Sequence, residues 1–406
     1  MVAGRGAAGA ALAATFLAGA AASLALAWFV RTPAPSSRRA LATYARVLPW
    51  DVVHRRALAR ADLAGGRPRR ARARLRATLP RAPLAAPLWV DAAEAALHAG
   101  RWREARRMAL RGASLAPADG ESCGRAALVL LQANDLEAAV GPLRCEVENL
   151  SERLPRVLDL AAEVYPRVHD LLRVLPPGDA WLRALLQWAY GRGRAEAAAV
   201  GWETLAASGA TAADRIRHVE FLLRRGEVDG AEAVWRPVWG PRPPGTVFDG
   251  GFETDVAGGF GWRIARTGAA AVTLDASASL EGRRGLRIEF RGGNPDFDGP
   301  SQVVPVEAGR RHVLTAMVRG EGITSAAGPR PRVGPHASCP AMGRVEGADV
   351  RGTTRWRRVA VEFDVPADCR AVVVSFARPP TARLDREIRG VFAADAVSLA
   401  VRSDGQ

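Results

Sequence analysis

The sequence contains no lysine: its 57 basic residues are all arginine, and against 42 acidic residues they give a net charge of +15. Together with the heavy use of alanine, the missing lysine indicates a codon bias toward GC-rich DNA. The arginines of residues 69–76 interleave with apolar residues along a predicted helix, which is typical of a solvated helix face, although contact of this stretch with anionic headgroups or an acidic polysaccharide stays open. Because no reading motif accompanies the charge, we expect no nucleic-acid binding.

Catalytic signatures are also missing. The six histidines are scattered singly, and none belongs to a nucleophile motif such as G-x-S-x-G. The glycine-rich residues 191–194 follow a predicted helix and not a strand, so they do not form a phosphate loop. The sequence therefore predicts a protein that is not an enzyme. A hydrolase with two opposed carboxylates is the remaining catalytic alternative, because the fold alone sets their separation.

Residues 7–30 are uncharged. As a helix they would extend about 36 Å, which exceeds the hydrocarbon core of about 30 Å. We therefore expect residues 1–31 to form a membrane anchor, with a cleavable signal peptide as the alternative. Trp28 followed by Arg31 favours the anchor, since tryptophan prefers the membrane interface.

Cysteine is scarce, with four residues and no C-x-x-C pair, which argues against a zinc site. Cys123 and Cys145 lie 11 residues on either side of Asn134, so a helical hairpin folded there would place them at the same height. Cys339 and Cys369 fall together in the C-terminal region. An even number, paired region by region behind an export segment, predicts two disulfides in an oxidising compartment, whereas four buried thiols are the alternative.

A turn signal recurs every 34 residues, at Gly66, Gly100 and Asn134, and further copies begin at Gly193 and Gly226. The first three are each followed five positions later by an alanine, namely Ala71, Ala105 and Ala139. Helix pairs of this length cannot bury their apolar faces alone, so we expect them to stack into a solenoid over residues 40–240. Prolines interrupt the period between Asn134 and Gly193, where residues 154–175 are expected to form an irregular pair.

The best copy of this repeat, residues 88–117, resembles the tetratricopeptide repeat. The residues at matching offsets are Gly100, Trp102, Glu104, Ala105, Gly112, Leu115 and Pro117. The resemblance implies an all-α solenoid that binds a protein partner.

A proline-rich linker is predicted at residues 241–245, where the composition changes. From residue 246 onward the helical period gives way to alternation, as in Leu286, Ile288 and Phe290. Short alternating segments between Gly, Pro and Asp predict an antiparallel sandwich over residues 246–402.

This region resembles a jelly-roll carbohydrate-binding module of the galactose-binding-like group. The matching pieces are residues 248–253, 259–262, 282–288, 302–306 and 395–399, with Trp356. The resemblance implies an all-β jelly roll, glycan binding, and a structural calcium held by Glu253 and Asp395. Two carboxylates from opposite ends of the domain suit that ion, since calcium prefers several hard oxygens; a pair of surface acids is the alternative.

Exposed aromatic rings are few for a sugar-binding module. The region has no tyrosine, and Trp262 and Trp356 match positions that are buried in the resembling group. Phe297, in a predicted loop, is therefore the glycan-stacking candidate.

The sequence as a whole predicts a multidomain bacterial envelope protein with an N-terminal transmembrane helix. A single pass of the inner membrane would place the solenoid and the sandwich on the extracytoplasmic side, and a tethering role in polysaccharide synthesis or export would follow. The alternative is an assembly scaffold whose sandwich makes protein contacts and binds no sugar.

Overall fold

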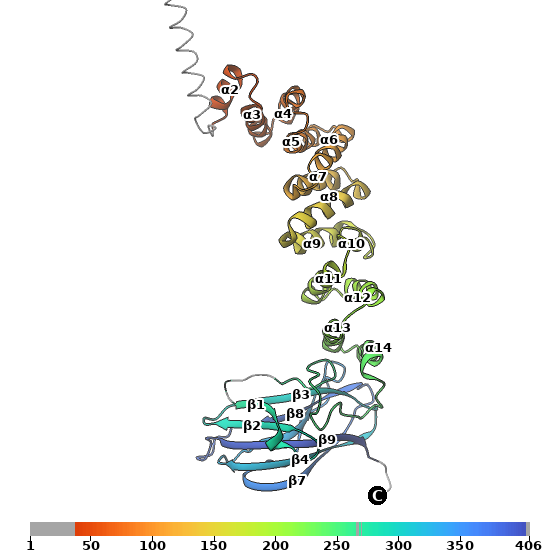
Figure 1. The fold of residues 1–406 in the computed structure, drawn as a ribbon, viewed down its shortest axis with the longest axis vertical. Helices are drawn as coiled ribbons and strands as arrows, with labels where there is room; N and C mark the ends of the chain where they lie inside the picture. The colour runs from red at the N-terminus through yellow and green to blue at the C-terminus, as the bar shows by residue number, and fades with distance from the viewer. Residues whose placement is uncertain (1–36, 265–267, 269, 403–406) are drawn as a thin grey trace, which may run out of the picture. The chain divides into compact units, whose positions relative to one another are not determined.

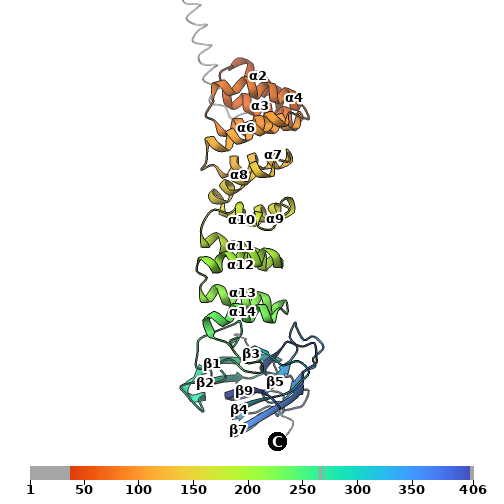
Figure 2. The same cartoon turned by 90° about the vertical axis from the view of Figure 1, so that its right-hand side faces the viewer.

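The computed structural model describes residues 37–264, 268 and 270–402, and its chain divides into two compact units, Met1–Leu205 and Ala206–Gln406. The described residues of the first unit form helices joined by short turns (Figures 1 and 2). Its helices are α2 (Arg38–Val47), α3 (Val52–Ala64), α4 (Pro68–Thr78), α5 (Ala86–His98), α6 (Trp102–Leu115), α7 (Gly120–Gln132), α8 (Leu136–Asn149), α9 (Leu154–Val164), α10 (Asp170–Arg173), α11 (Asp179–Arg192) and α12 (Ala195–Ser208). Short 3-10 turns, Leu79–Arg81 and Ser151–Arg153, follow α4 and α8.

The fold class expected from the sequence includes a transmembrane helix, and the structure corrects this expectation. No helix in the described part of the chain is long and apolar enough to cross a membrane. The described helices have at most 14 residues, about 21 Å of length, which is too short to span a hydrocarbon core of about 30 Å, and most of them contain arginine. The predicted anchor, residues 1–31, lies outside the described residues.

Each predicted turn lies between the two helices of one pair: α3 and α4, α5 and α6, α7 and α8, and α11 and α12. Gly66, Gly100, Asn134 and Gly193 all have positive φ, between 57° and 72°, a conformation in which glycine and asparagine end a helix cheaply. The alanines five positions after them, Ala71, Ala105, Ala139 and Ala198, are 0% exposed. The small side chain allows the close helix crossing that the repeat requires. Where the period fails, α10 has only four residues, as expected for an irregular pair.

An ion-pair network links three successive repeats of this unit. Asp91 on α5 is 1% exposed. Its carboxylate accepts hydrogen bonds at 2.5 Å from Arg56 on α3 and from Arg125 on α7. Arg125 also pairs with Glu94 at 2.8 Å. Because the three elements lie 34 or 35 residues apart in sequence, this buried charge holds the register between repeats.

Both predicted disulfides are confirmed. Cys123 on α7 is bonded to Cys145 on α8, with the Cα atoms 5.9 Å apart. Cys339 is bonded to Cys369, with a Cα separation of 4.5 Å.

The second unit begins with two helices, α13 (Ala212–Arg224) and α14 (Val228–Trp239), and continues as a β-sandwich. One sheet has the order β1-β2-β9-β4-β7 and the other β3-β8-β5-β6, and all pairings are antiparallel (Figure 1). The strands are β1 (Ala270–Asp275), β2 (Gly285–Arg291), β3 (Phe297–Pro305), β4 (Arg311–Ile323), β5 (Arg330–Gly334), β6 (Val345–Glu346), β7 (Gly352–Asp364), β8 (Ala371–Arg378) and β9 (Arg389–Val401). The core lies between the two sheets, as the alternation predicted.

The α13–α14 hairpin packs directly on the sandwich. Trp235 of α14 is 2% exposed, and its ring meets Phe248 and Phe260 edge-on at 5.3 and 5.6 Å between centroids. The guanidinium carbon of Arg242 lies 4.6 Å from the centre of the Phe260 ring. Residues of the predicted linker are thus part of this contact: the N–H of Gly245 donates to the carbonyl of Pro305 at 2.7 Å. The domain boundaries predicted at 240 and 246 stay a prediction.

Candidate functional site

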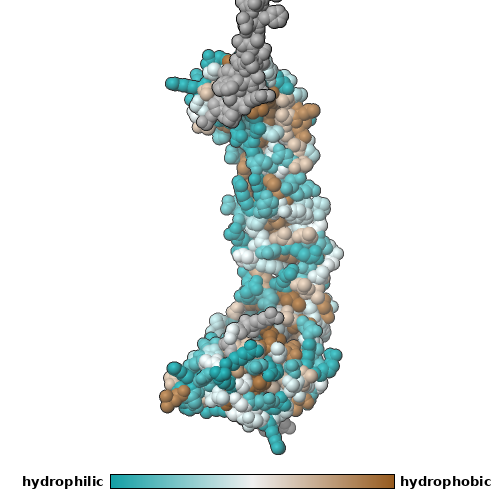
Figure 3. Space-filling view, turned by 60° about the vertical axis from the view of Figure 1, so that its left-hand side comes forward, coloured by the Kyte–Doolittle hydropathy of each residue, from teal (hydrophilic) through white to brown (hydrophobic). Residues whose placement is uncertain are grey.

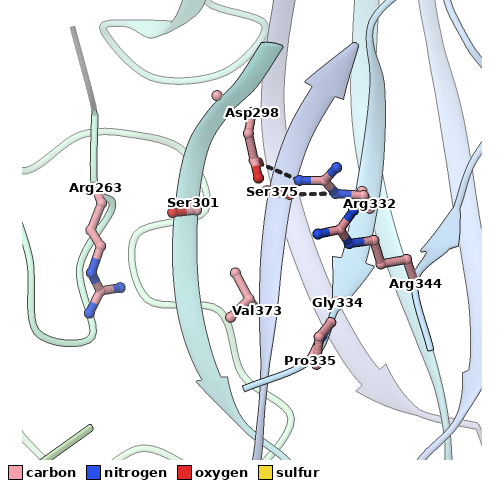
Figure 4. Close-up of a pocket in the computed structure, with 10 residues that line it drawn as sticks. Arg263, Asp298, Ser301, Arg332, Gly334, Pro335, Arg344, Val373 and Ser375 are labelled. Atoms are coloured by element: carbon pink, nitrogen blue, oxygen red, sulfur yellow. Dashed lines mark hydrogen bonds and ion pairs between the residues drawn. The ribbon is translucent and has the colours of Figure 1, made fainter. Parts of the chain in front are cut away.

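A cleft of about 440 Å³ lies on the outer face of the four-stranded sheet. We call it the arginine cleft (Figure 4). It is lined by Arg263, Asp298, Gly299, Ser301, Arg332, Gly334, Pro335, Arg344, Val373 and Ser375. Its volume falls within the range of ligand sites in proteins, about 300–1,000 Å³.

The strand alternation places these side chains on one face. Val304, Val333 and Val374 are 0% exposed and point into the sandwich core, so their sequence neighbours point outward. The register then aligns Ser301 of β3 with Ser375 of β8, and Ser375 with Arg332 of β5. An isolated bridge pairs Arg263 with Ser301 and extends the row by one strand. Two hydroxyls thus lie between two guanidinium groups across the floor of the cleft.

Positive charge exceeds negative charge in this cleft. Arg332 donates to the Ser375 hydroxyl at 3.3 Å and forms an ion pair with Asp298. Arg344 is exposed, and no carboxylate in the described ranges is paired with it. Figure 4 shows the Arg332 and Arg344 guanidiniums close together on the same side of the cleft. Three arginines face Asp298 and Glu220, the carboxylate beside Arg263, which leaves an excess of one positive charge at the cleft.

A second hollow of about 370 Å³ adjoins the arginine cleft and shares Arg263, Ser301, Pro335 and Val373 with it. Helix α13 contributes Glu220 to its wall. The Glu220 carboxylate forms an ion pair with the Arg263 guanidinium at 2.8 Å. Arg263 also donates to the carbonyl of Gly259 at 2.7 Å. The α13 helix therefore holds one arginine of the cleft in position.

His336 lies in the wall of this second hollow. Burial, with the nearby charge of Arg263, lowers the pKa of His336 to about 4. The imidazole is therefore neutral at pH 7 and adds no charge to the site.

The structure corrects the exposure expected for Phe297. Its side chain is 1% exposed and packs edge-on against Phe290, with 5.3 Å between the ring centroids. A buried ring cannot stack on a sugar. Trp262 is buried as expected, at 4% exposure, whereas Trp356 is half-buried on the other sheet, with the Arg319 guanidinium 5.2 Å from its ring centre.

Glu253 and Asp395 both hold the loop that precedes β2. Glu253 accepts hydrogen bonds from the backbone N–H groups of Arg283 at 2.7 Å and Arg284 at 3.2 Å. Asp395, which is 0% exposed, accepts from the N–H groups of Leu280 at 2.7 Å and Glu281 at 3.1 Å. The two carboxylates are thus brought to the same loop.

These carboxylates do not present a donor set that fits calcium. The second Asp395 oxygen accepts from the N–H of Ala396 at 2.7 Å, and the second Glu253 oxygen lies 3.3 Å from the guanidinium of Arg283. The N–H groups of Arg283 and Arg284 lower the pKa of Glu253, because they stabilise its charged form. These donors direct positive charge at the oxygens that a cation would need, so calcium at Glu253 and Asp395 stays a prediction that the resemblance implies.

The helical unit has a hollow of its own, of about 420 Å³, beside the irregular α9–α10 pair. Tyr165, Leu171 and Trp188 contribute to its wall, together with Arg167 and Arg194. On the face shown in Figure 3, hydrophobic residues are interspersed with hydrophilic ones along the helices.

Comparison with known proteins gives structural neighbours alone: no family model and no curated protein matches the sequence. The CBM22-1 xylan-binding domain of Paenibacillus barcinonensis Xyn10C is 14% identical, with a TM-score of 0.28, over 40% of this chain and 97% of that domain. The CBM22-1–GH10 modules of Clostridium thermocellum Xyn10B, complexed with xylohexaose, are 14% identical with a TM-score of 0.28 over 39% of this chain, and the match spans only 29% of that chain.

A helical neighbour is Pseudomonas aeruginosa PilF, at 16% identity and a TM-score of 0.29, over 48% of this chain and 93% of that chain. All of these TM-scores lie below 0.5. The description of a helical region followed by a β-sandwich therefore rests on the chain's own structure.

Proposed function

We propose that the protein is a non-catalytic binding protein whose sandwich binds a glycan in the arginine cleft and whose helical repeats hold a protein partner. The observation that carries the proposal is the row Arg263, Ser301, Ser375 and Arg332 across the floor of the cleft. Hydroxyls and guanidiniums provide the hydrogen-bond donors and acceptors that the hydroxyl and ring oxygens of a sugar chain need. The hollow beside α9 and α10 supports the second part, because repeat proteins bind partners on surfaces between their helices.

The two disulfides support an extracytoplasmic compartment, because disulfides are rare where thiols are kept reduced. When the protein is unfolded in denaturant without a reductant, we expect thiol labelling to detect no reactive cysteine. After reduction of the same sample, we expect it to detect four. Four reactive thiols without reductant would contradict this location.

Binding of the full chain to a panel of bacterial and plant polysaccharides tests the glycan part. We expect saturable binding to at least one of them, at a stoichiometry of one site per chain. The panel is run with calcium and after chelation. Because the oxygens of Glu253 and Asp395 already accept hydrogen bonds, we expect chelation to change neither the binding nor the melting temperature.

An assembly scaffold is the second candidate, since the described residues that line the cleft include no aromatic ring to stack on a sugar. A folded chain that binds no polysaccharide would favour the scaffold and would exclude glycan binding by the sandwich. A melting temperature lowered by chelation would in turn support calcium ligation.

A further inference from the structure

We infer that the ligand of the arginine cleft is an acidic polysaccharide, one that carries carboxylates on its sugar rings. This inference rests on the proposed glycan-binding function and names its ligand class. Neutral glycans are commonly recognised by stacking on exposed aromatic rings, and the ten described lining residues supply none. The cleft supplies charge and hydrogen-bond donors in their place.

The guanidinium groups are suited to carboxylates. Arginine presents N–H groups in a planar fork that matches the two oxygens of a carboxylate, and it stays charged at any physiological pH. Arg344 is exposed at the rim and is not engaged by an acidic side chain in the described part of the chain. It is therefore the group available for a carboxylate of the ligand.

Arg332 lies deeper and is held in one orientation. Its side chain is 12% exposed and is fixed between Asp298 and the Ser375 hydroxyl. Asp298 is 64% exposed on its side chain, so a ligand carboxylate competes with a solvated group and not with a buried one. Arg263 is fixed by Glu220 at the opposite side of the row. Arg332 and Arg263 are thus positioned before the ligand arrives, which reduces the conformational entropy lost on binding.

The hydroxyls of the floor distinguish a sugar from a simple anion. Ser301 is half-buried and offers a donor and an acceptor to a ligand, whereas Ser375, paired with it across the strands, is 2% exposed and holds Arg332. A chain that carries both carboxylates and hydroxyls satisfies the two kinds of group together, whereas an acidic peptide offers only the first. We therefore assign the cleft to a polyuronate-like glycan.

The test compares polygalacturonate with the same polymer after methyl esterification, which removes the negative charge of each carboxylate and adds a methyl group. With the full-length chain we expect polygalacturonate to bind at least about tenfold more tightly, which is the loss typical of removing a charged hydrogen bond. Its dissociation constant should rise with sodium chloride, because salt screens exposed charges. Heparin separates sulfate from carboxylate, and poly-glutamate tests whether charge alone suffices.

Variants locate the site. Arg344→Gln and Arg332→Gln should each weaken polygalacturonate binding by about tenfold or more. Arg358→Gln is the matched control: Arg358 is an exposed arginine on β7 of the other sheet, and its loss should leave binding unchanged. Arg344 is exposed, so its substitution should leave the melting temperature unchanged as well.

The outcomes separate the inference from the proposed function. Equal binding of the esterified polymer, or binding of a neutral glycan that Arg344→Gln and Arg332→Gln leave intact, would overturn the acidic-ligand inference while glycan binding stands. Heparin bound in preference to polygalacturonate would replace the carboxylate with a sulfate and overturn the assignment. Poly-glutamate bound as tightly as polygalacturonate would assign the cleft to acidic protein segments. No binding of any polysaccharide would remove the glycan-binding part of the proposed function and favour the scaffold.

Discussion

Replacing Arg378 with methionine is expected to lower the free energy of unfolding of the sandwich unit by about 3–5 kcal/mol. Arg378, at the end of β8, is 0% exposed. Its guanidinium donates to a set of acceptors from three loops, all within 2.8–3.0 Å: Asn294 Oδ1 and the hydroxyl of Ser325, with the carbonyls of Pro295, Ala327 and Arg386. Methionine has a similar length but no donor, so several buried oxygens would lose their partner.

Urea denaturation followed by tryptophan fluorescence measures this effect. Arg383→Met, at an exposed position in the loop after β8, is the matched control and should change stability by less than about 0.5 kcal/mol. Arg378→Lys should lie between the two, because one ammonium cannot reach all of the loops. A loss below about 1 kcal/mol for Arg378→Met would show that these loops do not depend on the guanidinium.

Replacing Asp91 with alanine is expected to destabilise the helical unit by about 3–5 kcal/mol. The change would leave Arg56 and Arg125, whose side chains are 30% and 19% exposed, without the carboxylate between them. Burial alone would lower the pKa of Arg125, but hydrogen bonds with Glu94 and Asp91 raise it, which shows how strongly the pairing favours its charge. Thermal unfolding followed by circular dichroism at 222 nm measures the loss.

Glu137→Ala is the control for Asp91. Glu137 also pairs with an arginine, Arg173, but its side chain is 78% exposed. Water already solvates such a charge, so we expect a change below about 1 kcal/mol. If the two variants lost equal stability, burial would not explain the importance of Asp91.

The repeat and the sandwich were predictable because their signals are local. A left-handed turn needs glycine or asparagine, and Gly66, Gly100 and Asn134 mark such turns at a fixed spacing. The cysteine pairing followed from the symmetry of Cys123 and Cys145 about Asn134. Each turn and the Cys123–Cys145 pair depend on residues within one helical hairpin, and each strand is recognised from the alternation of its own residues.

Phe297 shows why a local signal can fail. The sequence placed it in a loop, but it is the first residue of β3, beyond a register shift between Asp298 and Ser301 that turns its ring into the core. Gly299 then makes room for the ring: a Cβ atom there would lie 2.3 Å from Phe297. A bulge cannot be recognised from alternation, because it is the place where alternation stops.

The arginine cleft could not be predicted from the sequence, for a different reason. Alternation in residues 330–333 does predict that Arg332 points to the outer face of the sheet, away from the core side where its neighbour Val333 is buried. Its meeting with Arg263 and Arg344, however, depends on strand register and on the path of two loops across more than 60 residues. The position of Arg263 also depends on Glu220, which belongs to a helix that the sequence assigned to the solenoid. Contacts of this kind follow from the fold and cannot be read from spacing.

We infer that an acidic glycan occupies the outer face of the four-stranded sheet, over the arginine cleft. Hydrogen exchange of the full chain, measured by mass spectrometry with and without an oligogalacturonate, tests it most directly. We predict slower exchange in β3, β5 and β8 and in the segment around Arg344, with no change in β4 and β7 of the other sheet. Protection confined to the helical unit or to the other sheet would contradict the account.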